Sequence, residues 1–401
     1  MSDGQQSERR LETKMVRTSA AASEHHEHAS SIYMTSSFTF EDAEHARAMF
    51  AREQEGYIYT RYANPNVSEF VEKICALEGA DAGVAVASGM SAVFTALAGL
   101  LDSGDHVLAS RSVFGSTHQI LTNILPRWGI THSYGEIGEP EKWAELVRPN
   151  TRVCIVETPS NPALDLIDLD WLGAFCNERD IVLIVDNVFA TPMLQTPLRH
   201  GAHLVMHSAT KYIDGQGRGI GGILVGEKEL IGKLAGFTRH TGPSLSPFNA
   251  WLFSKSLETL SVRMERHCDN AEKVADYLYG HPDVVFVKYP HHPSHQQVEL
   301  AKRQMCRGGG MVTFEVKGGL EQGRRFLDGM ELCSLTANLG DSRTIATHPA
   351  STTHSSLTEE ARQAVGITAG LIRVSVGLEH ADDIIGDIGQ ALERSRVAVM
   401  V

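Results

Sequence analysis

Apolar residues in the middle of the chain occur in short continuous runs rather than in alternation with polar residues. These runs have the length of strands and lie at 83–87, 106–109, 153–156, 181–185 and 203–206. Segments with helical spacing, or long enough for a buried helix, lie between several of them. Continuous apolar strands are typical of a mostly parallel sheet with both faces covered. We therefore predict an α/β fold whose mainly parallel sheet spans about residues 80–230.

The order of elements changes after about residue 250. Helical periodicity covers much of 247–279, and a later apolar strand is expected at 371–376. A chain of 401 residues is long enough for two domains of ordinary size. We expect three parts, namely an N-terminal arm at 1–55, a large domain at 56–255 and a smaller C-terminal α/β domain at 256–401.

Composition and charge exclude several classes of partner. The chain is 42% hydrophobic and 21% charged, and its formal net charge of −13 comes without a basic block. We therefore expect neither nucleic acid nor an anionic membrane as partner, although a small anionic ligand needs only local positive groups. No apolar run reaches the ~18 residues that cross a bilayer. The first ten residues lack the apolar core of a secretory signal, so we expect a cytoplasmic protein.

Cysteines and histidines do not indicate a metal site. The six cysteines are scattered without a Cys-x-x-Cys pair, which favours neither a zinc site nor a disulfide framework. Three histidines lie at 25, 26 and 28, but adjacent residues do not converge on one ion. A solvated N-terminal arm is the better interpretation, and we predict no metal.

Chemically active residues gather where the expected strands end. Ligands on parallel sheets bind at the carboxyl ends of the strands. The residues that fall at such ends are Ser88, Glu157, Asn161, Asp186, Ser208 and Lys211. A lysine taken without context is a solvated surface residue. The convergence of the other side chains argues against that interpretation for Lys211.

The stretch 207–212 has the composition of a pyridoxal phosphate site. A lysine amine forms an imine with the aldehyde of this cofactor, and nearby hydroxyls can hold its phosphate. Ser88 and Gly89 precede an apolar helical run, where free backbone N–H groups form a natural phosphate seat. Arg61 is a candidate anion ligand, although an aromatic loop packing on another surface explains that segment equally well. Arg373 interrupts an apolar strand, which indicates a partner or ligand for its charge.

The motifs, taken in their order along the chain, resemble the Cys/Met-metabolism pyridoxal phosphate enzymes. They are Tyr-x-Arg at 59–61, Ser-Gly-Met at 88–90, Glu-Thr-Pro-Ser-Asn-Pro at 157–162, Val-Asp-Asn at 185–187, Ser-x-Thr-Lys at 208–211 and Leu-Ile-Arg-x-Ser-Val-Gly-Leu-Glu at 371–379. The likeness runs from about residue 30 to the end. Stretches at 112–117, 211–219, 338–341 and 348–354 resemble the O-succinylhomoserine sulfhydrylase branch of that family.

This resemblance implies a fold of the aspartate aminotransferase-like type, fold type I, and a role for each matching residue. Lys211, Asp186 and Phe114 would be catalytic, with Lys211 linked covalently to the cofactor and Asp186 paired with its pyridine nitrogen. Further cofactor contacts are implied for Ser88, Gly89, Met90, Phe114, Asn161, Ser208 and Thr210, and for Tyr59 and Arg61 of a neighbouring subunit. Substrate contacts are implied for Arg373, Asn338 and Tyr59. One departure is Phe114, where most of the family has tyrosine, because phenylalanine can stack on the cofactor but cannot transfer a proton.

The implied activity is γ-replacement in methionine biosynthesis, in which O-succinylhomoserine and sulfide give homocysteine and succinate. Alternatives are a cystathionine γ-synthase with cysteine as nucleophile, a methionine or cystathionine γ-lyase, and a cofactor-free protein that kept the fold. The acyl group, succinyl or acetyl, stays open at this point. The resemblance also implies a homodimer as the minimum active unit and a homotetramer as the usual assembly.

Overall fold

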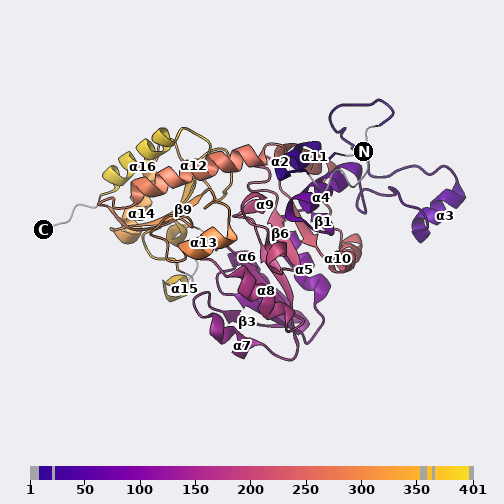
Figure 1. Cartoon of the computed structure of the whole chain (residues 1–401), viewed down its shortest axis with the longest axis horizontal. Helices are drawn as coiled ribbons and strands as arrows, with labels where there is room; N and C mark the ends of the chain where they lie inside the picture. The colour runs from indigo at the N-terminus through magenta and orange to yellow at the C-terminus, as the bar shows by residue number, and fades with distance from the viewer. Residues whose placement is uncertain (1–8, 20–22, 353–358, 364–365, 397–401) are drawn as a thin grey trace.

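The computed structural model describes residues 9–19, 23–352, 359–363 and 366–396. Within these residues the chain forms a seven-stranded sheet and a five-stranded sheet, each with its own helices (Figure 1). Two residues of the stretch at 348–354, Thr353 and His354, lie outside the described part of the chain.

The larger sheet has the strand order β1-β7-β6-β5-β4-β2-β3. Its strands are β1 (Ala82–Val86), β2 (His106–Ser110), β3 (Thr131–Gly135), β4 (Thr151–Glu157), β5 (Val182–Asp186), β6 (Leu204–Ser208) and β7 (Gly222–Gly226). Neighbours from β3 to β6 pair in parallel, whereas β7 runs antiparallel to both β6 and β1. The prediction of a mainly parallel sheet is therefore confirmed.

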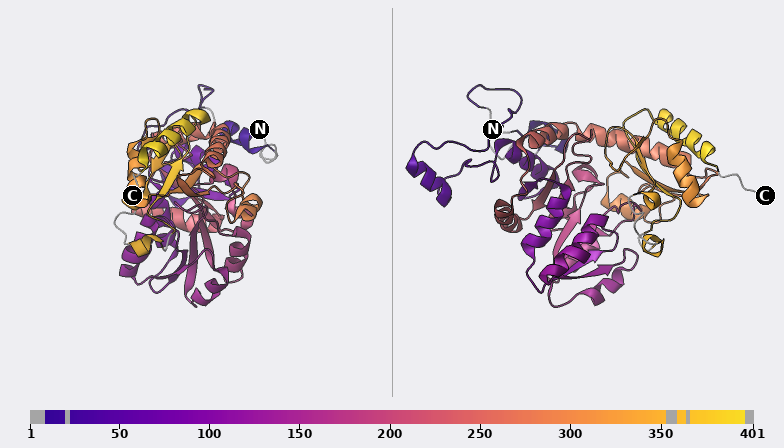
Figure 2. Two further views of the ribbon diagram at one scale, coloured as in Figure 1. Left: turned by 90° about the vertical axis from the view of Figure 1, so that its left-hand side faces the viewer. Right: turned by 180° about the vertical axis from the view of Figure 1, so that it is seen from behind.

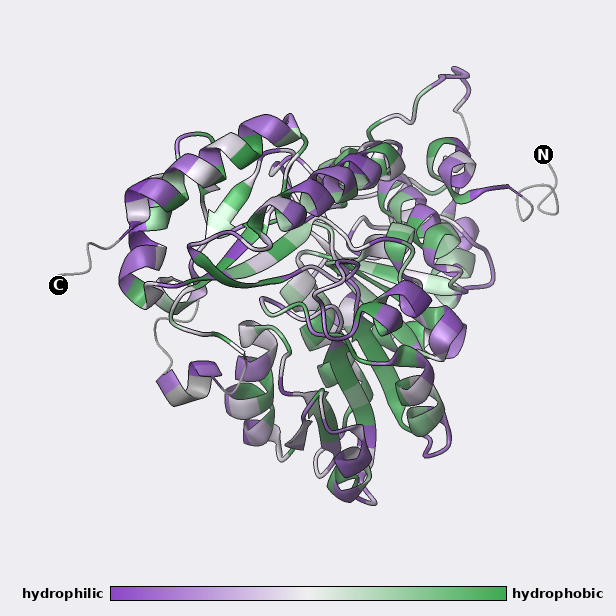
Figure 3. Ribbon diagram, turned by 60° about the vertical axis from the view of Figure 1, so that its left-hand side comes forward, coloured by the Kyte–Doolittle hydropathy of each residue, from purple (hydrophilic) through white to green (hydrophobic). Residues whose placement is uncertain are grey.

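Helices cover both faces of this sheet because its strands are apolar on both sides. In β4, Val153 and Ile155 pack in one hydrophobic cluster, while Cys154 and Val156 pack in another. One face carries α4 (Pro65–Glu78), α8 (Leu169–Asn177) and α11 (Pro247–Leu257), and the other carries α5 (Gly89–Leu100) and α10 (Lys228–Thr241). Figure 3 shows green, hydrophobic strands flanked by helices in which purple and green residues mix.

Local sequence signals set where several of these helices begin and end. The Asn64 side chain accepts a hydrogen bond from the backbone N–H of Asn66 at 3.0 Å, and Pro65 occupies the first turn of α4. Gly79 ends that helix with a φ of 73°, a left-handed conformation that favours glycine. The Asp168 carboxylate caps α8 by accepting from the N–H of Trp171 at 3.1 Å.

The smaller sheet has the order β10-β11-β12-β9-β8 and is antiparallel except between β10 and β11. Its strands are β8 (Val284–Lys288), β9 (Met311–Val316), β10 (Ser334–Leu335), β11 (Ile345–Thr347) and β12 (Leu371–Ser375). Helices α12 (Leu260–Leu278), α14 (Gly319–Asp328) and α16 (Ala381–Ser395) pack on Phe314, Ile372 and Val374. Alternation along β12 then directs Arg373 and Ser375 to the opposite face.

That opposite face of the smaller sheet meets the loop that follows β4. The hydroxyl of Thr313, in β9, donates a 2.7 Å hydrogen bond to the carbonyl of Pro162. Arg373 pairs with Thr313 in the sheet and therefore lies over the same loop. The charged residue inside an apolar strand thus points at the carboxyl edge of the larger sheet.

The remaining elements are short or lie outside the two sheets. The helices are α2 (Leu11–Arg17), α3 (Ala43–Ala51), α6 (Gly115–Gln119), α7 (Trp143–Leu146), α9 (Thr191–Leu194), α13 (Val298–Gln304) and α15 (Glu359–Gln363). Tighter or wider turns lie at Ile120–Ile124, Leu125–Trp128, Pro140–Lys142, Pro197–His200 and Pro349–Ser351. The segment around α3 projects from the body on the side opposite the C-terminus (Figures 1 and 2). In the described part of the chain, we find no helix with the combined length and apolarity that a membrane span requires.

Candidate active site

The carboxyl ends of the parallel strands bring the expected site residues to one edge. Glu157 and Asp186 are the last residues of β4 and β5 and lie opposite each other in register. Asp186 also pairs with Met206 of β6, two residues before Ser208. Parallel register places these ends side by side, which explains why residues more than 50 positions apart share one site.

The turn before α5 forms an anion seat beside Ser208. Ser88 caps this twelve-residue helix, and its Oγ accepts from the N–H of Ser91 at 3.1 Å. The N–H groups of Gly89 and Met90 occupy the first helical positions, where no intrahelical carbonyl is available. A methyl group on Gly89 would lie 2.7 Å from Cβ of Ser208, so only glycine allows this close approach. The seat therefore combines backbone N–H groups with the Ser208 hydroxyl, a combination suited to phosphate.

Thr210 is held next to that seat by the backbone of the following loop. Its Oγ1 accepts from the N–H of Gly221 at 3.2 Å and lies 3.4 Å from the carbonyl oxygen of the same residue. The hydroxyl is thus fixed in place one residue before Lys211.

Lys211 lies half-buried between the two sheets. Its Nζ donates to Oδ1 of Asn338 at 2.7 Å, a residue 127 positions further along the chain. Burial, helped by the nearby charge of Arg373, lowers the pKa of Lys211 from 10.5 to about 8. A sizeable fraction of this amine is therefore neutral and nucleophilic near neutral pH, as a residue that bonds to an aldehyde requires.

Arg373 is 6% exposed, and its guanidinium group is held by hydrogen bonds. Its Nη1 donates to Oδ1 of Asn161 at 2.9 Å, and its Nη2 donates to the carbonyl of Asn338 at 3.2 Å. The Nε atom is buried and has no hydrogen-bond partner among the described residues. Burial lowers the pKa of Arg373 to about 10, so it keeps its positive charge at neutral pH. A charged donor held in this way suits a carboxylate ligand.

Two carboxyl groups share the floor of the site. Burial raises the pKa of Asp186 to about 6, while the N–H of Val188, 3.1 Å from Oδ1, counteracts the shift. Burial raises the pKa of Glu157 well above its ordinary value, and the neighbouring charge of Asp186 raises it further. Asp186 is therefore the group of the pair that ionises first as the pH rises.

Phe114 immediately precedes α6 and is 40% exposed. A hydrogen bond from the backbone N–H of Phe114 lowers the pKa of Glu157. Phe114 therefore lies at the same edge of the sheet as Glu157. The exposed ring is available to stack on a planar group bound there.

A network of buried polar side chains contacts residues next to the strand ends that carry the site. Oε1 of Glu78 accepts from His207 Nε2 at 2.6 Å and from Asn187 Nδ2 at 3.0 Å. Gln195 donates to Asn187 Oδ1 and to the carbonyl of Thr158, both at 2.9 Å. Thr158, Asn187 and His207 are each the sequence neighbour of a site residue. The network therefore fixes the backbone next to Glu157, Asp186 and Ser208. No short motif in the sequence indicates it, because Glu78 lies more than 100 residues from its partners.

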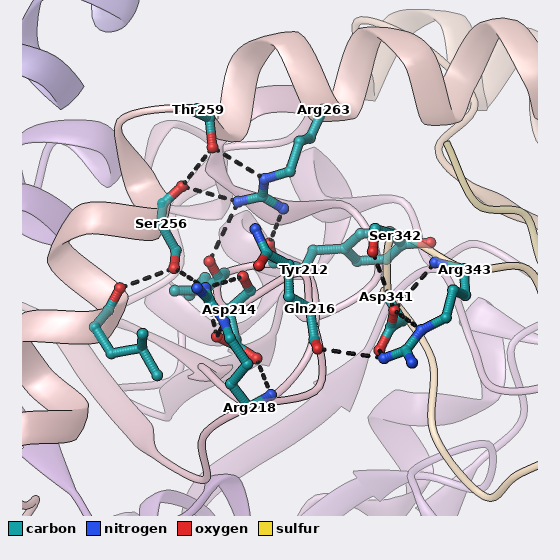
Figure 4. Close-up of polar contacts among 12 residues, drawn as sticks. Tyr212, Asp214, Gln216, Arg218, Ser256, Thr259, Arg263, Asp341, Ser342 and Arg343 are labelled. Atoms are coloured by element: carbon teal, nitrogen blue, oxygen red, sulfur yellow. Dashed lines mark hydrogen bonds and ion pairs between the residues drawn. The ribbon is translucent and has the colours of Figure 1, made fainter. Parts of the chain in front are cut away.

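The loop after Lys211 is held by three arginines (Figure 4). Arg263 donates to the carbonyls of Tyr212, at 2.6 Å, and Ile213, at 3.3 Å. Gly215 has a φ of 68°, and any Cβ there would collide with the Arg263 guanidinium. The remaining contacts are Arg218 with Asp214, Arg343 with Asp341 and with the carbonyl of Gln216, and the N–H of Ser342 with the carbonyl of Gly215.

Tyr59 and Arg61 are not brought to the site by contacts within this chain. Both are exposed, and the Arg61 guanidinium lies 5.4 Å from the Tyr59 ring centroid and 4.8 Å from that of Tyr62. Arg61 also donates to the carbonyl of Arg239. Their expected contact with the phosphate of a neighbouring subunit stays a prediction.

The donor set fits pyridoxal phosphate. The seat at Gly89 and Ser208 suits the phosphate, the neutral fraction of Lys211 suits the aldehyde, and Asp186 is an acceptor for a protonated ring nitrogen. The exposed ring of Phe114 offers the stacking surface. The remaining buried donor, Nε of Arg373, can serve a carboxylate outside the ring.

Residues 12–393 match the family of Cys/Met metabolism PLP-dependent enzymes, so the chain belongs to this family and pyridoxal phosphate is its cofactor. A solved structure of a putative O-acetylhomoserine (thiol)-lyase from Campylobacter jejuni, which carries N'-pyridoxyl-lysine-5'-monophosphate, is similar. Its TM-score is 0.92 at 35% identity, covering 96% of this chain and 100% of that one. These findings confirm the predicted family, fold class and cofactor.

Two relatives indicate which activities this chain resembles. An O-succinylhomoserine sulfhydrylase from Pseudomonas aeruginosa is 46% identical over 382 residues, which cover 95% of each chain. An L-methionine γ-lyase from Porphyromonas gingivalis is 43% identical over 368 residues, covering 91% of this chain and 92% of the relative.

Proposed function

We propose that this chain is an O-succinylhomoserine sulfhydrylase that converts O-succinylhomoserine and sulfide to homocysteine and succinate. The observation that carries this proposal is the cluster of Lys211, Asn338 and Arg373. It sets an amine with a pKa of about 8 beside a fixed guanidinium suited to an amino-acid carboxylate. The choice of reaction within the family is supported by the Pseudomonas relative and by the branch motifs at 112–117 and 211–219.

Pyridoxal phosphate, when bound, supplies an electron sink for the substrate α-carbon. Lys211 then acts as base and acid, because its neutral amine can take the proton at Cα, give that proton up, and then take a proton at Cβ. The C–O bond of the acyl ester breaks at Cγ, where a C–S bond forms. Succinate leaves with the electron pair of the broken bond, and the protons removed by Lys211 return to Cβ and Cα.

Arg373 orients the substrate. Its guanidinium binds the α-carboxylate and so directs the Cα–H bond toward Lys211. Asn161 and the backbone of Asn338 already hold the guanidinium, so little side-chain freedom is lost when substrate binds. We assign Asn338 a second substrate contact through its side chain once Lys211 releases it.

Phe114 contributes stacking without proton transfer. Its ring has no group that titrates, so we assign the proton movements at Cα and Cβ to Lys211. A mechanism in which the phenol of a tyrosine at this position moves a proton does not apply to this chain.

The proposed assembly is a homodimer as the minimum unit and a homotetramer as the complete enzyme, in the cytoplasm. Support comes from Tyr59 and Arg61, which are exposed and therefore free to contact a second copy. The division into an arm at 1–55, a cofactor domain at 56–255 and a small domain at 256–401 belongs to the same proposal.

A steady-state assay with two esters and two nucleophiles tests the proposed reaction. O-succinylhomoserine and O-acetylhomoserine are each supplied with sulfide, with cysteine or with no nucleophile. We expect the highest kcat/KM for the succinyl ester with sulfide and homocysteine as product. Cystathionine as main product would favour a cystathionine γ-synthase, and ammonia with a 2-oxo acid would favour a γ-lyase, as in the Porphyromonas relative. Lys211→Ala is the control, and normal turnover by that variant would refute the mechanism.

A further inference from the structure

Glu157 is a buried acid at the site edge to which the proposed reaction gives no role. It ends β4, the residue is 5% exposed, and Oε2 has no hydrogen-bond partner among the described residues. A buried carboxylate whose oxygen has no hydrogen-bond partner loses its hydration free energy without compensation. A protonated carboxyl avoids most of that cost.

The groups around Glu157 make its charged form unfavourable. Asp186 lies directly opposite on the neighbouring strand, at the typical spacing of about 5 Å between strands. The two carboxyl groups feel each other's charge, and two buried carboxylates coupled in this way do not ionise together near neutral pH. The Phe114 backbone N–H and the charge of Arg373 act in the opposite direction, but burial and Asp186 outweigh them.

Arg373 does not serve as the ion-pair partner that would keep Glu157 charged. The guanidinium instead makes its hydrogen bonds to Asn161 Oδ1 and to the carbonyl of Asn338. Neither of these acceptors carries a charge, so the positive charge of Arg373 stays available for an anionic ligand. A charged Glu157 beside Arg373 would compete with that ligand.

We propose that Glu157 is a positioning residue that works in its protonated form. As a neutral acid it leaves Asp186 as the single negative charge facing the cofactor ring nitrogen, and its carbonyl oxygen holds the backbone N–H of Phe114. The same carboxyl group would thereby support both Asp186, the expected partner of the ring nitrogen, and Phe114, the expected stacking residue. This inference rests on the proposed pairing of Asp186 with the ring nitrogen, and it is independent of which ester or nucleophile the enzyme uses.

The direct test is infrared spectroscopy of the holoenzyme at neutral pH, without substrate. We expect a protonated carboxyl band that shifts when the protein contains ¹³C-labelled glutamate and is missing in Glu157→Gln. The labelled native protein keeps this test valid even if the variant does not fold. Absence of any isotope-sensitive carboxyl band between about pH 6 and 8 would overturn the inference, since an acid with a strongly raised pKa keeps its proton there.

Two variants separate a neutral from a charged role. Glu157→Gln is an isosteric neutral substitute, so we expect the midpoint of the pH-dependent visible absorption of the bound cofactor to stay within about 0.3 units of native. We also expect KM and kcat within about twofold of native. Glu157→Ala removes the support of the Phe114 amide, and we expect it to alter the visible spectrum at every pH. A shift of the midpoint by about one unit or more in Glu157→Gln would show that Glu157 works as a charge.

The outcome is distinguishable from a failure of the proposed reaction. The spectra use holoenzyme alone, so they give the same answer if the acyl group or nucleophile proves to be different. A holoenzyme without a visible band that depends on Lys211 would instead contradict the proposed cofactor link itself.

Discussion

The lowered pKa of Lys211 leads to a measurable property of the protein without cofactor. At about pH 7.5, an amine with a pKa of about 8 is neutral in roughly a quarter of the molecules, whereas one at 10.5 is neutral in roughly one in a thousand. The reactive fraction is therefore about 240 times larger than for an ordinary lysine. We expect the rate at which the apoprotein combines with pyridoxal phosphate to rise with pH and level off above about pH 8.

Competitive amine labelling of the apoprotein, read residue by residue from peptide masses, tests this value. Lys228 is exposed at the start of α10 and serves as a control within the same molecule. Arg373→Gln removes the smaller cause of the shift and leaves burial, so the Lys211 midpoint should rise only part of the way toward 10.5. A Lys211 midpoint that coincides with that of Lys228 would refute the reasoning.

The same pKa has a consequence for stability, whose sign follows from proton binding. Between about pH 8 and 10.5 the unfolded chain keeps the Lys211 proton that the folded chain has lost, so Lys211 makes the folded state more stable as pH rises. The slope is at most about 1.4 kcal/mol per pH unit. Lys211→Met, which has similar volume and no charge, should remove this slope in chemical denaturation of the apoprotein. An unchanged slope in that variant would contradict burial as the cause.

Three further substitutions test separate parts of the site. Arg373→Ala should raise KM for the amino-acid substrate by roughly 10- to 100-fold, the value of a charge-assisted hydrogen bond, and an unchanged KM would contradict its role. Gly89→Ala should bind pyridoxal phosphate more weakly in a spectroscopic titration, because the new methyl group meets Ser208 Cβ at 2.7 Å and displaces the Ser208 hydroxyl. Glu78→Ala should lower the free energy of unfolding by about 3–5 kcal/mol in urea denaturation, since it leaves His207 and Asn187 buried without their acceptor. A loss below about 1 kcal/mol would show that the network behind the strand ends is not needed for stability.

The edge that carries the site could be predicted because strand ends are visible in the sequence. Apolar runs ending in Ser208, Asp186 and Glu157 indicate parallel strands, and parallel strands share one carboxyl edge. Two strands of the same sheet could not be predicted this way. β3 is a largely polar edge strand, so no apolar run marks it. β7 is a short apolar run between two glycines, and that pattern does not indicate that the strand runs antiparallel to both of its neighbours.

Contacts between residues far apart in the sequence are the part of the site that could not be predicted. Arg373 stands out because its charge interrupts an apolar strand, and Lys211 stands out because it follows the end of one. The hydrogen bond from Lys211 to Asn338 depends on how the smaller sheet packs against the larger one, and no local pattern reports that. Glu157 was visible at a strand end, but the proximity of a second acid, Asp186, became apparent only from the register of β4 and β5.

The smaller sheet contributes to the site because alternate side chains of β12 point to opposite faces of that sheet. Arg373 and Ser375 face the larger sheet, and the Ser375 hydroxyl accepts from the N–H of Gly340 at 2.8 Å. Gly340 lies two residues after Asn338, so one strand places both the guanidinium and the partner of the Lys211 amine. A slip of β12 by one residue would turn Ile372 and Val374 toward the site and remove both functions together. Antiparallel pairing on both sides of β12, with β9 and β11, opposes that slip.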